Sequence, residues 1–394
     1  MAKIASAGNY GPKIRSDCMV TIELTDSGGV HIELISKVKD FFGDHIITLA
    51  QDELKFFGVK NAKLKIEDQG AFDFVIAARI EAALKKADPS ITTSYLPEIK
   101  SHCTYTTSKD ALRRSRLYLP GNSPKLMLNA GLHGADALIL DLEDSVHPDE
   151  KDSARILVRN ALRTINFHGA EKMVRINQLP LGFEDIKEVI NENVHVILIP
   201  KCESKQQVLD VNESIDELNK TESPVYLMPI IESAKGVLHA YEIASASDNI
   251  VALTLGLEDY TADIGVTRSK SEAECFFAKS MVVNAAKAAG VQAIDTVFSD
   301  VNDMEGLFEN VKQAKAMGFD GKGCIHPRQI RVIHKAFLPT KQELEKAQKI
   351  VEAYNAAKKE GKGVVSLGSK MIDAPVVKQA QHVLKMAKIG GMIQ

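Results

Sequence analysis

The sequence lacks the features that would place the chain in a membrane or outside the cell. No apolar run approaches the ~18 residues that cross a bilayer, and the N-terminus has no apolar signal-peptide core. The five cysteines are far apart, odd in number and form no CxxC pair, which argues against a disulfide framework and a zinc site. We therefore expect a cytoplasmic protein with reduced thiols.

The sequence also has no large excess of positive or negative side chains. The chain has 49 basic and 52 acidic side chains, and a formal net charge of −3 gives no support to nucleic-acid or membrane partners. The G-x-G-x-x-G and G-x-x-x-x-G-K-[ST] fingerprints are missing, which weakens a dinucleotide or P-loop interpretation. What remains is a chain of 394 residues, 45% of them apolar, which is enough for two domains with a sizeable core.

The sequence pattern of residues 1–90 predicts a small α+β domain. The alternating stretch from Met19 to Ser36 is interrupted by DSGG, which indicates a β-hairpin. Helical periodicity follows in FGDHIITLAQDELKFF and FDFVIAARIEAALKKA, with a strand in NAKLKIED between them. Residues 91–111 are rich in Ser, Thr and Pro and predict a flexible linker.

Residues 112–339 follow a different and regular pattern. Eight short apolar runs alternate with helix-sized intervals: RLYLPG, ADALILDLED, KMVRIN, VHVILIPK, VYLMPIIES, IVALTLGLED, QAIDTVFSD and GKGCIHP. Eight strand–helix alternations favour an α/β fold of the (β/α)8 TIM-barrel type over an open doubly wound sheet. Residues 340–394 predict a C-terminal helical extension or lid that packs on the barrel or on a neighbouring subunit.

Polar residues stand where the predicted strands end, which in a TIM barrel is the face that carries the active site. They are Asp141, Glu143, Asp144, Arg175, Asn177, Lys201, Glu232, Ser233, Glu258, Asp259, Asp300 and His326. Crowded carboxylates repel one another unless a cation compensates them, and oxygen ligands suit Mg²⁺. Glu232 and Asp259, on adjacent strands, are the predicted ligands.

Simpler interpretations stay open for these residues. A carboxylate at a strand end can cap the next helix or pair with Arg or Lys. His326 precedes a proline, and without a Ser or Cys nucleophile motif a structural role is favoured. Lys201 could form a Schiff base, but beside a metal site a charge-balancing role is favoured.

The motifs RRSRLYLPGNS, ILDLEDSV, VRIN, LIPKCES, PIIESAKG, GLEDYTADIG, GFDGKGCIHPRQI and GVVSLGSKMIDAP occur in this order. From Arg113 to the C-terminus the chain thereby resembles the β subunit of citrate lyase and its relatives, the citryl-, citramalyl- and malyl-CoA lyases of the HpcH/HpaI aldolase family. Residues 4–88 are similar to the γ subunit, the acyl carrier protein of the same enzyme. This similarity rests on the motifs SDCMV and IEDQGAFDFVIAARIEAALKKA. The resemblance implies a γ–β fusion.

The resemblance also implies roles for individual residues. Glu232 and Asp259 would hold Mg²⁺, and Arg175 would contact the substrate during catalysis. Asp373, in MIDAP, would reach the site of a neighbouring subunit as an acid/base group. Arg114, Glu143 and Asp144 would line the mouth and bind substrate. The implied reaction is Mg²⁺-dependent cleavage of a citryl thioester, carried on the acyl carrier or on CoA, into an acetyl thioester and oxaloacetate.

Partners and alternatives follow from the same resemblance. It implies a transferase α subunit, a homo-oligomer (trimer or hexamer), and a phosphoribosyl-dephospho-CoA group on serine, which would make the chain a phosphoprotein. In the family this serine stands two residues before an aspartate; here Arg15 occupies that position, so Ser16 is the candidate, with a plain turn serine as the alternative. A citramalyl- or malyl-CoA lyase using free CoA, a non-catalytic carrier scaffold, and a phosphoenolpyruvate-type barrel enzyme stay open.

Overall fold

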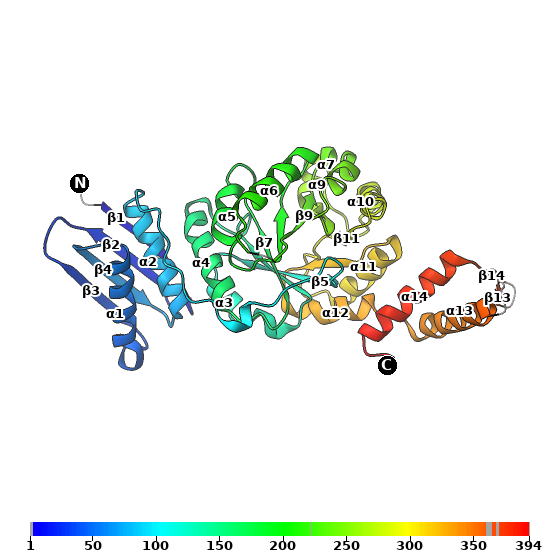
Figure 1. Ribbon diagram of the computed structural model, residues 1–394, viewed down its shortest axis with the longest axis horizontal. Coiled ribbons are helices and arrows are strands. Elements are labelled where there is room, and N and C mark those ends of the chain that lie inside the picture. The colour runs from blue at the N-terminus through cyan, green and yellow to red at the C-terminus, as the bar shows by residue number, and fades with distance from the viewer. Residues whose placement is uncertain (1–2, 222, 360–364, 368–369, 394) are drawn as a thin grey trace.

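The computed structural model describes residues 3–221, 223–359, 365–367 and 370–393. Three parts follow one another along an elongated molecule: an N-terminal domain, a barrel and a helical arm (Figure 1). In these described ranges, no helix combines the length and the apolar character needed to cross a membrane.

The N-terminal domain is a four-stranded sheet covered by two helices. Its strand order is β1-β2-β4-β3, with α2 against β1 and β2 and α1 against β3. Alternate side chains of the central strands are buried, as the two-residue period of a strand requires. The elements are β1 (Lys3–Gly8), β2 (Cys18–Leu24), β3 (Val30–Ser36), α1 (Lys39–Phe56), β4 (Ala62–Asp68) and α2 (Asp73–Ala87).

The predicted hairpin between β2 and β3 is wrong. Both strands exist, but β4 lies between them, antiparallel to β2 and parallel to β3. Asn61, just before β4, separates the two strands at their turn: its carbonyl accepts from the Thr25 N–H at 3.2 Å and its side-chain oxygen from the Gly29 N–H at 2.9 Å. The two predicted helices and the strand at 62–68 are confirmed.

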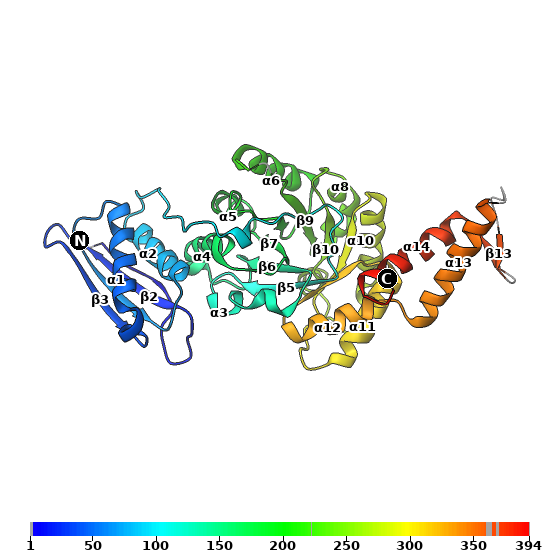
Figure 2. The ribbon, with the colours of Figure 1, turned by 60° about the horizontal axis from the view of Figure 1, so that its bottom comes forward.

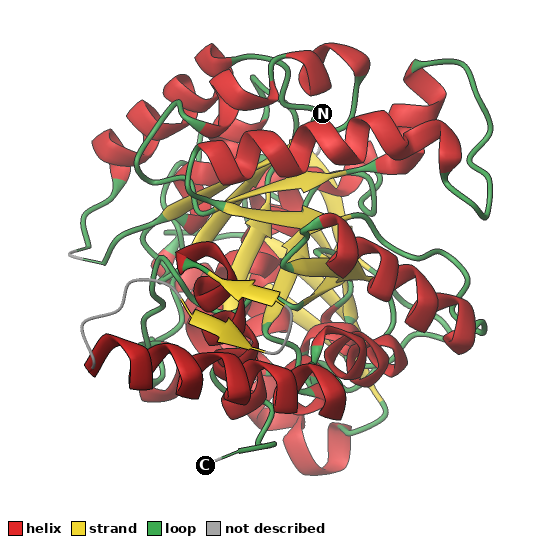
Figure 3. Cartoon of the chain, turned by 90° about the vertical axis from the view of Figure 1, so that its right-hand side faces the viewer, coloured by secondary structure: helices red, strands yellow, loops and turns green. Residues whose placement is uncertain are grey.

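The second part is the predicted TIM barrel. Eight parallel strands close on themselves, with β12 paired to β5, and helices surround them (Figure 3). The strands are β5 (Ser115–Pro120), β6 (Ala137–Asp141), β7 (Glu171–Arg175), β8 (Val196–Ile199), β9 (Tyr226–Ile231), β10 (Ala252–Leu255), β11 (Gln292–Asp295) and β12 (Gly321–Cys324). Each is one of the eight apolar runs of the sequence.

Capping residues fix where several barrel helices begin. His326 accepts from the backbone N–H of Arg328 at 3.2 Å, and Ser233 from that of Gly236 at 3.1 Å, so both have structural roles. The helices are α3 (Pro124–Met127), α4 (Lys151–Thr164), α5 (Gly182–Val189), α6 (Lys205–Leu218), α7 (Ala234–Leu238), α8 (Ala240–Ala244), α9 (Leu257–Asp263), α10 (Phe276–Ala288), α11 (Met304–Met317) and α12 (Pro327–Phe337).

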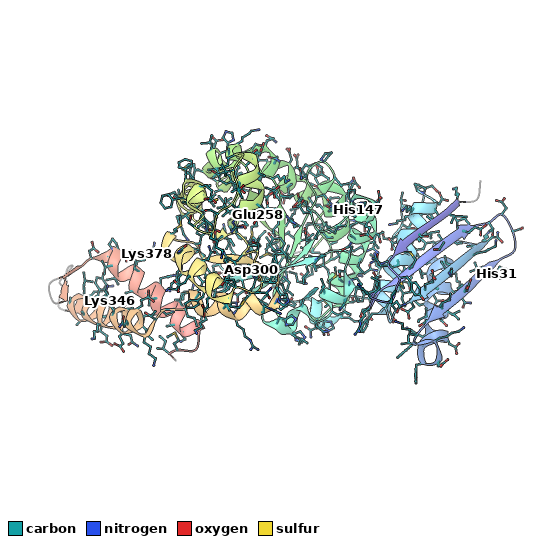
Figure 4. The ribbon with its side chains drawn as sticks, turned by 180° about the vertical axis from the view of Figure 1, so that it is seen from behind. His31, His147, Glu258, Asp300, Lys346 and Lys378 are labelled. Carbon is teal, nitrogen blue, oxygen red and sulfur yellow. The ribbon has the colours of Figure 1, made fainter. Side chains whose placement is uncertain are left out.

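The C-terminal arm projects from the barrel on the side opposite the N-terminal domain (Figure 2). Helices α13 (Lys341–Lys359) and α14 (Ala374–Ile389) pack against each other, and the strands β13 (Val365–Leu367) and β14 (Lys370–Ile372) pair beside them. Lys346 and Lys378 mark the two helices in Figure 4. The arm therefore has its own small apolar core, built around Ile350 and Ile372.

The expectation that residues 91–111 form a flexible tether is not met, because this linker is bonded to the barrel. Lys172 donates to the Cys103 carbonyl at 2.7 Å, and Thr107 donates to Glu171 at 2.7 Å. The Tyr105 hydroxyl donates to the Ala170 carbonyl at 2.6 Å. The hydroxyls of Thr107 and Tyr105 and the carbonyl of Cys103 therefore bond to buried residues at the amino end of the barrel.

The N-terminal domain is also fixed to the barrel. Arg159 of α4 forms two hydrogen bonds of 2.9 and 2.8 Å to Glu81 of α2, and both side chains are almost completely buried. Arg79 pairs with Asp17 at 2.9 Å through two nitrogens and donates to Ser153 of α4 at 2.7 Å. Buried bidentate ion pairs hold one geometry, so the domain is docked on α4.

Acid is expected to weaken the contacts that His195 makes between the linker and the barrel. Its ring lies against Tyr105, with Nε2–H donating to the Tyr105 carbonyl at 2.8 Å and Nδ1 accepting from the Lys172 N–H at 3.1 Å. Burial and the charge of Lys172 lower its pKa to about 4. Because the unfolded value is about 6.5, the free energy of unfolding should fall by about 2 to 3 kcal/mol as the pH drops from 7 to 4.5.

Urea unfolding at the two pH values measures this loss. His195→Gln, which keeps a donor and an acceptor, should reduce it, whereas His147→Gln at an exposed histidine should not. If the free energy of unfolding depends equally on pH in wild type and His195→Gln, the loss of stability in acid does not come from His195.

Candidate active site

The carboxyl ends of the barrel strands surround a pocket of about 440 Å³. Its lining includes Arg116, Tyr118, Asp141, Asp144, Arg175, Glu232, Thr254, Glu258 and Asp259. Glu258 marks this part of the barrel in Figure 4. Asp141 and Arg175 end their strands, and the four other acidic residues follow strand ends within four residues, so the predicted face of the barrel carries the pocket.

Glu232 is the buried carboxylate of the pocket. It follows β9, is 6% exposed, and accepts from the backbone N–H of Lys201 at 3.1 Å. Burial, with repulsion from Glu143 and Asp259, raises its pKa to about 8. A carboxylate in this environment becomes ionised at neutral pH when a cation joins it.

Asp259 lies in the first turn of α9, and Lys201 is its partner. The Lys201 Nζ atom is 2.9 Å from Asp259 Oδ1, which supports the charge-balancing role for this lysine. Among the residues placed by the structure, no group of three or more His, Cys, Asp or Glu could hold a metal ion. A pair of carboxylates would leave the remaining positions of an octahedral cation to water and substrate, as Mg²⁺ prefers.

Arg175 is joined to the acidic residues after β6. It donates to both oxygens of Asp141 at 2.6 and 2.8 Å, and it lies 2.8 Å from Glu143 and 3.3 Å from Asp144. Burial alone would raise the pKa of Asp141, but its hydrogen bonds to Arg175 lower it. Burial raises the pKa of Glu143 to about 7. The structure thus brings Arg175, Glu143 and Asp144 together, with the guanidinium 5.3 Å from the centre of the Tyr118 ring.

Arg114 does not line the mouth, contrary to the prediction. It precedes β5 and therefore lies at the amino end of the barrel, where it donates to both oxygens of Asp136 at 2.8 Å. The arginine that reaches the pocket is Arg116, two residues later. Asp300, labelled in Figure 4, follows β11 by several residues and is exposed, while Asp295 at the strand end lines the pocket.

Sequence reasoning missed Arg116, Tyr118 and Thr254, which enter the pocket from inside the barrel. One signal was present: an arginine within the apolar run RLYLP stands at a position where a strand buried on both faces normally carries an apolar residue.

Asp373 and Ser16 lie outside the pocket. Asp373 caps α14, accepting from the Val376 N–H at 3.2 Å, and stands in the chain between β14 and α14. Figure 1 shows β14 at the outer end of the arm. Ser16 has a positive φ of 58° and its N–H donates to the Gln69 carbonyl at 3.1 Å. Its neighbour Asp17 pairs with Arg79, which also donates to the Asn122 carbonyl at 3.1 Å in the loop after β5. The Ser16 turn is therefore held beside a loop at the carboxyl end of the barrel.

The geometry agrees with comparisons to known proteins. Residues 114–327 match the family model described as HpcH/HpaI aldolase/citrate lyase. The chain belongs to this family. Residues 5–87 match an acyl carrier family model described as malonate decarboxylase delta subunit (MdcD). The chain is thus a fusion of an acyl-carrier-like domain with an aldolase/citrate lyase barrel, as the sequence predicts.

Relatives of the aldolase/citrate lyase barrel include citrate lyase subunit beta of Leuconostoc mesenteroides subsp. cremoris, 39% identical over 292 residues, which are 73% of this chain and 97% of the relative. Rat mitochondrial citramalyl-CoA lyase is 31% identical over 79% of this chain and 96% of its own. These relatives cleave carbon–carbon bonds, and the chain is an enzyme of this lyase class.

Two solved structures share the fold. Protein CitE of Mycobacterium tuberculosis, in complex with magnesium, acetoacetate and coenzyme A, has 30% identity and a TM-score of 0.59, covering 71% of this chain and all of the other. The citrate lyase beta subunit of the same organism, complexed with oxaloacetate and magnesium, has 32% identity and a TM-score of 0.50, covering 59% of this chain and 99% of the other.

Gly256→Ala is expected to disturb the candidate metal site. A Cβ atom at this position would lie 2.6 Å from Glu232 Oε1, so the carboxylate would have to move. Displacing a ligand in this way typically weakens metal binding by about tenfold or more. Titration calorimetry with Mg²⁺ measures the change, with Ser145→Ala in the same pocket as control. Unchanged affinity in Gly256→Ala would contradict a role for Glu232 as ligand.

Proposed function

We propose that the chain cleaves a citryl thioester into an acetyl thioester and oxaloacetate, with Mg²⁺ held by Glu232 and Asp259. The observation that carries the proposal is the buried Glu232, which shares the pocket at the barrel mouth with Asp259 and with Arg175. Two solved relatives that bind magnesium, one of them with oxaloacetate, support it. So does the name citrate lyase subunit beta, which relatives of about 40% identity carry.

The residues fit a hard divalent cation. The donors are carboxylate oxygens, and positive charge would offset the burial and the mutual repulsion that raise the pKa of Glu232. When bound, Mg²⁺ would supply Lewis acidity to the hydroxyl of the substrate and lower its pKa. The cation would compete with Lys201 for Asp259.

The side chains of the pocket supply position and charge. The carbon–carbon bond breaks when the tertiary hydroxyl loses its proton and the bonding electrons form a thioester enolate. Arg175, held rigidly by Asp141, keeps a fixed guanidinium next to the region where the new carbonyl forms. Because these groups are already oriented in the free protein, little reorganisation is needed during the reaction.

A proton donor for the enolate carbon is assigned to Asp373 of a neighbouring subunit. In its own chain, Asp373 stands between β14 and α14 of the arm and does not line the pocket. An arm that extends away from its own barrel could place Asp373 over the pocket of another copy in a trimer or hexamer. Activity would then depend on assembly.

The acyl group is assigned to the docked carrier domain, through a phosphoribosyl-dephospho-CoA group on Ser16. The Ser16 turn lies beside the loop after β5, at the end of the barrel where the pocket opens. An arm attached there could enter the pocket without movement of the domain, at high effective concentration. An α subunit would load it.

Two alternatives differ in substrate or role. A citramalyl- or malyl-CoA lyase acting on free CoA thioesters uses the same pocket chemistry and is favoured if Ser16 is unmodified. A role only as a scaffold is disfavoured, since Glu232, Asp259 and Arg175 are gathered in one pocket. No feature of the pocket favours phosphoenolpyruvate chemistry.

The test combines a mass measurement with a turnover assay. Intact mass and peptide mapping across residues 14–20 of the natively expressed chain should show the prosthetic group on Ser16. With Mg²⁺, citryl-CoA should yield oxaloacetate faster than citramalyl-CoA yields pyruvate or malyl-CoA yields glyoxylate. Cleavage of citramalyl- or malyl-CoA alone would replace the proposed substrate, and no cleavage of any thioester by the assembled protein would overturn the function.

A further inference from the structure

Arg116 is a buried cation inside the barrel. Its side chain is completely buried, yet the guanidinium lines the pocket. Nη1 donates to Thr254 Oγ1 at 2.9 Å and contacts Met228 Sδ at 2.9 Å. Within the ranges that the structure describes, Nε and Nη2 have no hydrogen-bond partner. A buried guanidinium with unused donors is costly unless something pairs with it.

The residues around Arg116 are small or apolar. In the strand register, Arg116 lies between Ala137 on β6 and Gly323 on β12, two small residues. The apolar cluster around it, which includes Ile230 and Ile294, offers no counter-charge. The guanidinium therefore borders the pocket with two donors that are buried and form no hydrogen bond to a carboxylate in the described part of the chain.

Arg175, which also lines the pocket, and the cations bound to its acidic residues are already neutralised. Arg175 is paired with Asp141, Glu143 and Asp144. Lys201 is paired with Asp259, and Arg268 with Glu258. By contrast, Arg116 takes part in none of the ion pairs of the described chain.

We propose that Arg116 binds a carboxylate of the ligand in this pocket, namely the second carboxylate of a dicarboxylic 2-oxo acid. The inference rests on the proposed function, in which the 2-oxo group and the adjacent carboxylate lie at Glu232 and Asp259. Oxaloacetate carries a further carboxylate that pyruvate and 2-oxobutyrate lack. The unpaired donors of Arg116 match a carboxylate in a two-pronged hydrogen bond. Arg116 would thus select citryl over citramalyl thioesters.

Binding of oxaloacetate and 2-oxobutyrate to the Mg²⁺-loaded chain, measured by titration calorimetry, tests the proposal without turnover. These acids differ only in that a carboxylate replaces a methyl group. We expect wild type to bind oxaloacetate about 10- to 100-fold more tightly, the effect of one charge-assisted bidentate contact. Arg116→Met should remove this preference and leave 2-oxobutyrate binding within about threefold.

A control variant and a second substrate pair keep the test decisive. Met228→Leu removes the sulfur contact of Arg116 while keeping its apolar volume, and should preserve the preference for oxaloacetate. If Arg116→Met fails to fold, Arg116→Lys replaces it: it keeps the charge but loses the two-pronged contact, and should reduce the preference for oxaloacetate by about tenfold. Equal affinity of wild type for the two acids, or an unchanged preference in Arg116→Lys, would overturn the proposal. So would equal weakening of both acids in Arg116→Met.

Failure of the inference is distinguishable from failure of the proposed function. If the chain cleaves citryl-CoA but binds oxaloacetate and 2-oxobutyrate equally well, the proposed role of Arg116 is wrong and the proposed lyase activity stands. A strong preference for the dicarboxylic acid that depends on Arg116, without cleavage of any thioester, would keep the binding role and remove the lyase.

Discussion

Glu232→Gln is expected to reduce turnover of citryl-CoA by at least about a thousandfold and to abolish measurable Mg²⁺ binding, while leaving the fold intact. Glutamine keeps an oxygen that can accept from the Lys201 N–H, now bonded at 3.1 Å. It removes the negative charge that a cation needs. Because burial and the charges of Glu143 and Asp259 disfavour the ionised carboxylate, its loss should not lower the melting temperature measured without metal.

Glu258→Gln is the matched control for this substitution. Glu258 lines the same pocket but is exposed and paired with Arg268 at 2.7 Å. We expect Mg²⁺ affinity and turnover of this variant to stay within about threefold of wild type, because an exposed ion pair contributes little. Normal Mg²⁺ binding by Glu232→Gln would remove Glu232 from the metal site. A lower melting temperature would instead assign it a structural role.

The barrel could be predicted from the sequence because each strand is buried on both faces and each is followed by polar residues. The placement of Arg114 could not. Arg116 lies within β5 and Arg114 just before it, and the sequence does not show where a strand begins. Arg114 lies at the amino end of the barrel, and Arg116 inside it. Only two positions in the sequence separate Arg114, which forms an ion pair with Asp136, from Arg116, which lines the pocket.

Local pattern also failed where distant segments decide. Strands β2 and β3 alternate as a hairpin would, yet β4 lies between them and pairs with both along its whole length. The linker composition indicates a free tether. Its hydroxyls and carbonyls instead meet Lys172, Glu171 and Ala170, which lie more than sixty residues away.

Arg159→Met is expected to undock the N-terminal domain. The change leaves Glu81, which is completely buried, without the two hydrogen bonds of 2.8 and 2.9 Å that Arg159 donates. Glu81 keeps Lys85 at 2.7 Å and the Tyr95 N–H at 2.9 Å as partners, so losing the charged hydrogen bonds of Arg159 should cost about 1.5 to 3 kcal/mol. Residues 91–97, whose Tyr95 carbonyl also accepts from Arg159 at 3.2 Å, should then be cleaved by protease much faster than in wild type, and a separate unfolding transition of the domain should appear at lower temperature.

Glu188→Gln and a double variant are the controls. Glu188 is the other carboxylate on Arg159, at 2.8 Å, but it is partly exposed, so its loss should change stability by less than about 1 kcal/mol. Glu81→Leu combined with Arg159→Met replaces the buried pair by apolar groups and should restore much of the docking. Protease resistance of Arg159→Met equal to that of wild type would show that other contacts hold the domain.

The Arg159→Met variant also decides between a fixed and a swinging carrier. With free citryl-CoA, turnover should be unchanged, because Arg159 and the docked domain lie outside the pocket. When the acyl group is carried on Ser16, a carrier that works from a fixed position needs the docked geometry. Arg79 and Asp17 define this geometry beside the loop after β5. Undocking should then lower turnover of the attached substrate through a lower effective concentration at the pocket. Equal turnover of the attached substrate in both proteins would instead indicate that the carrier works while mobile, and that docking serves stability alone.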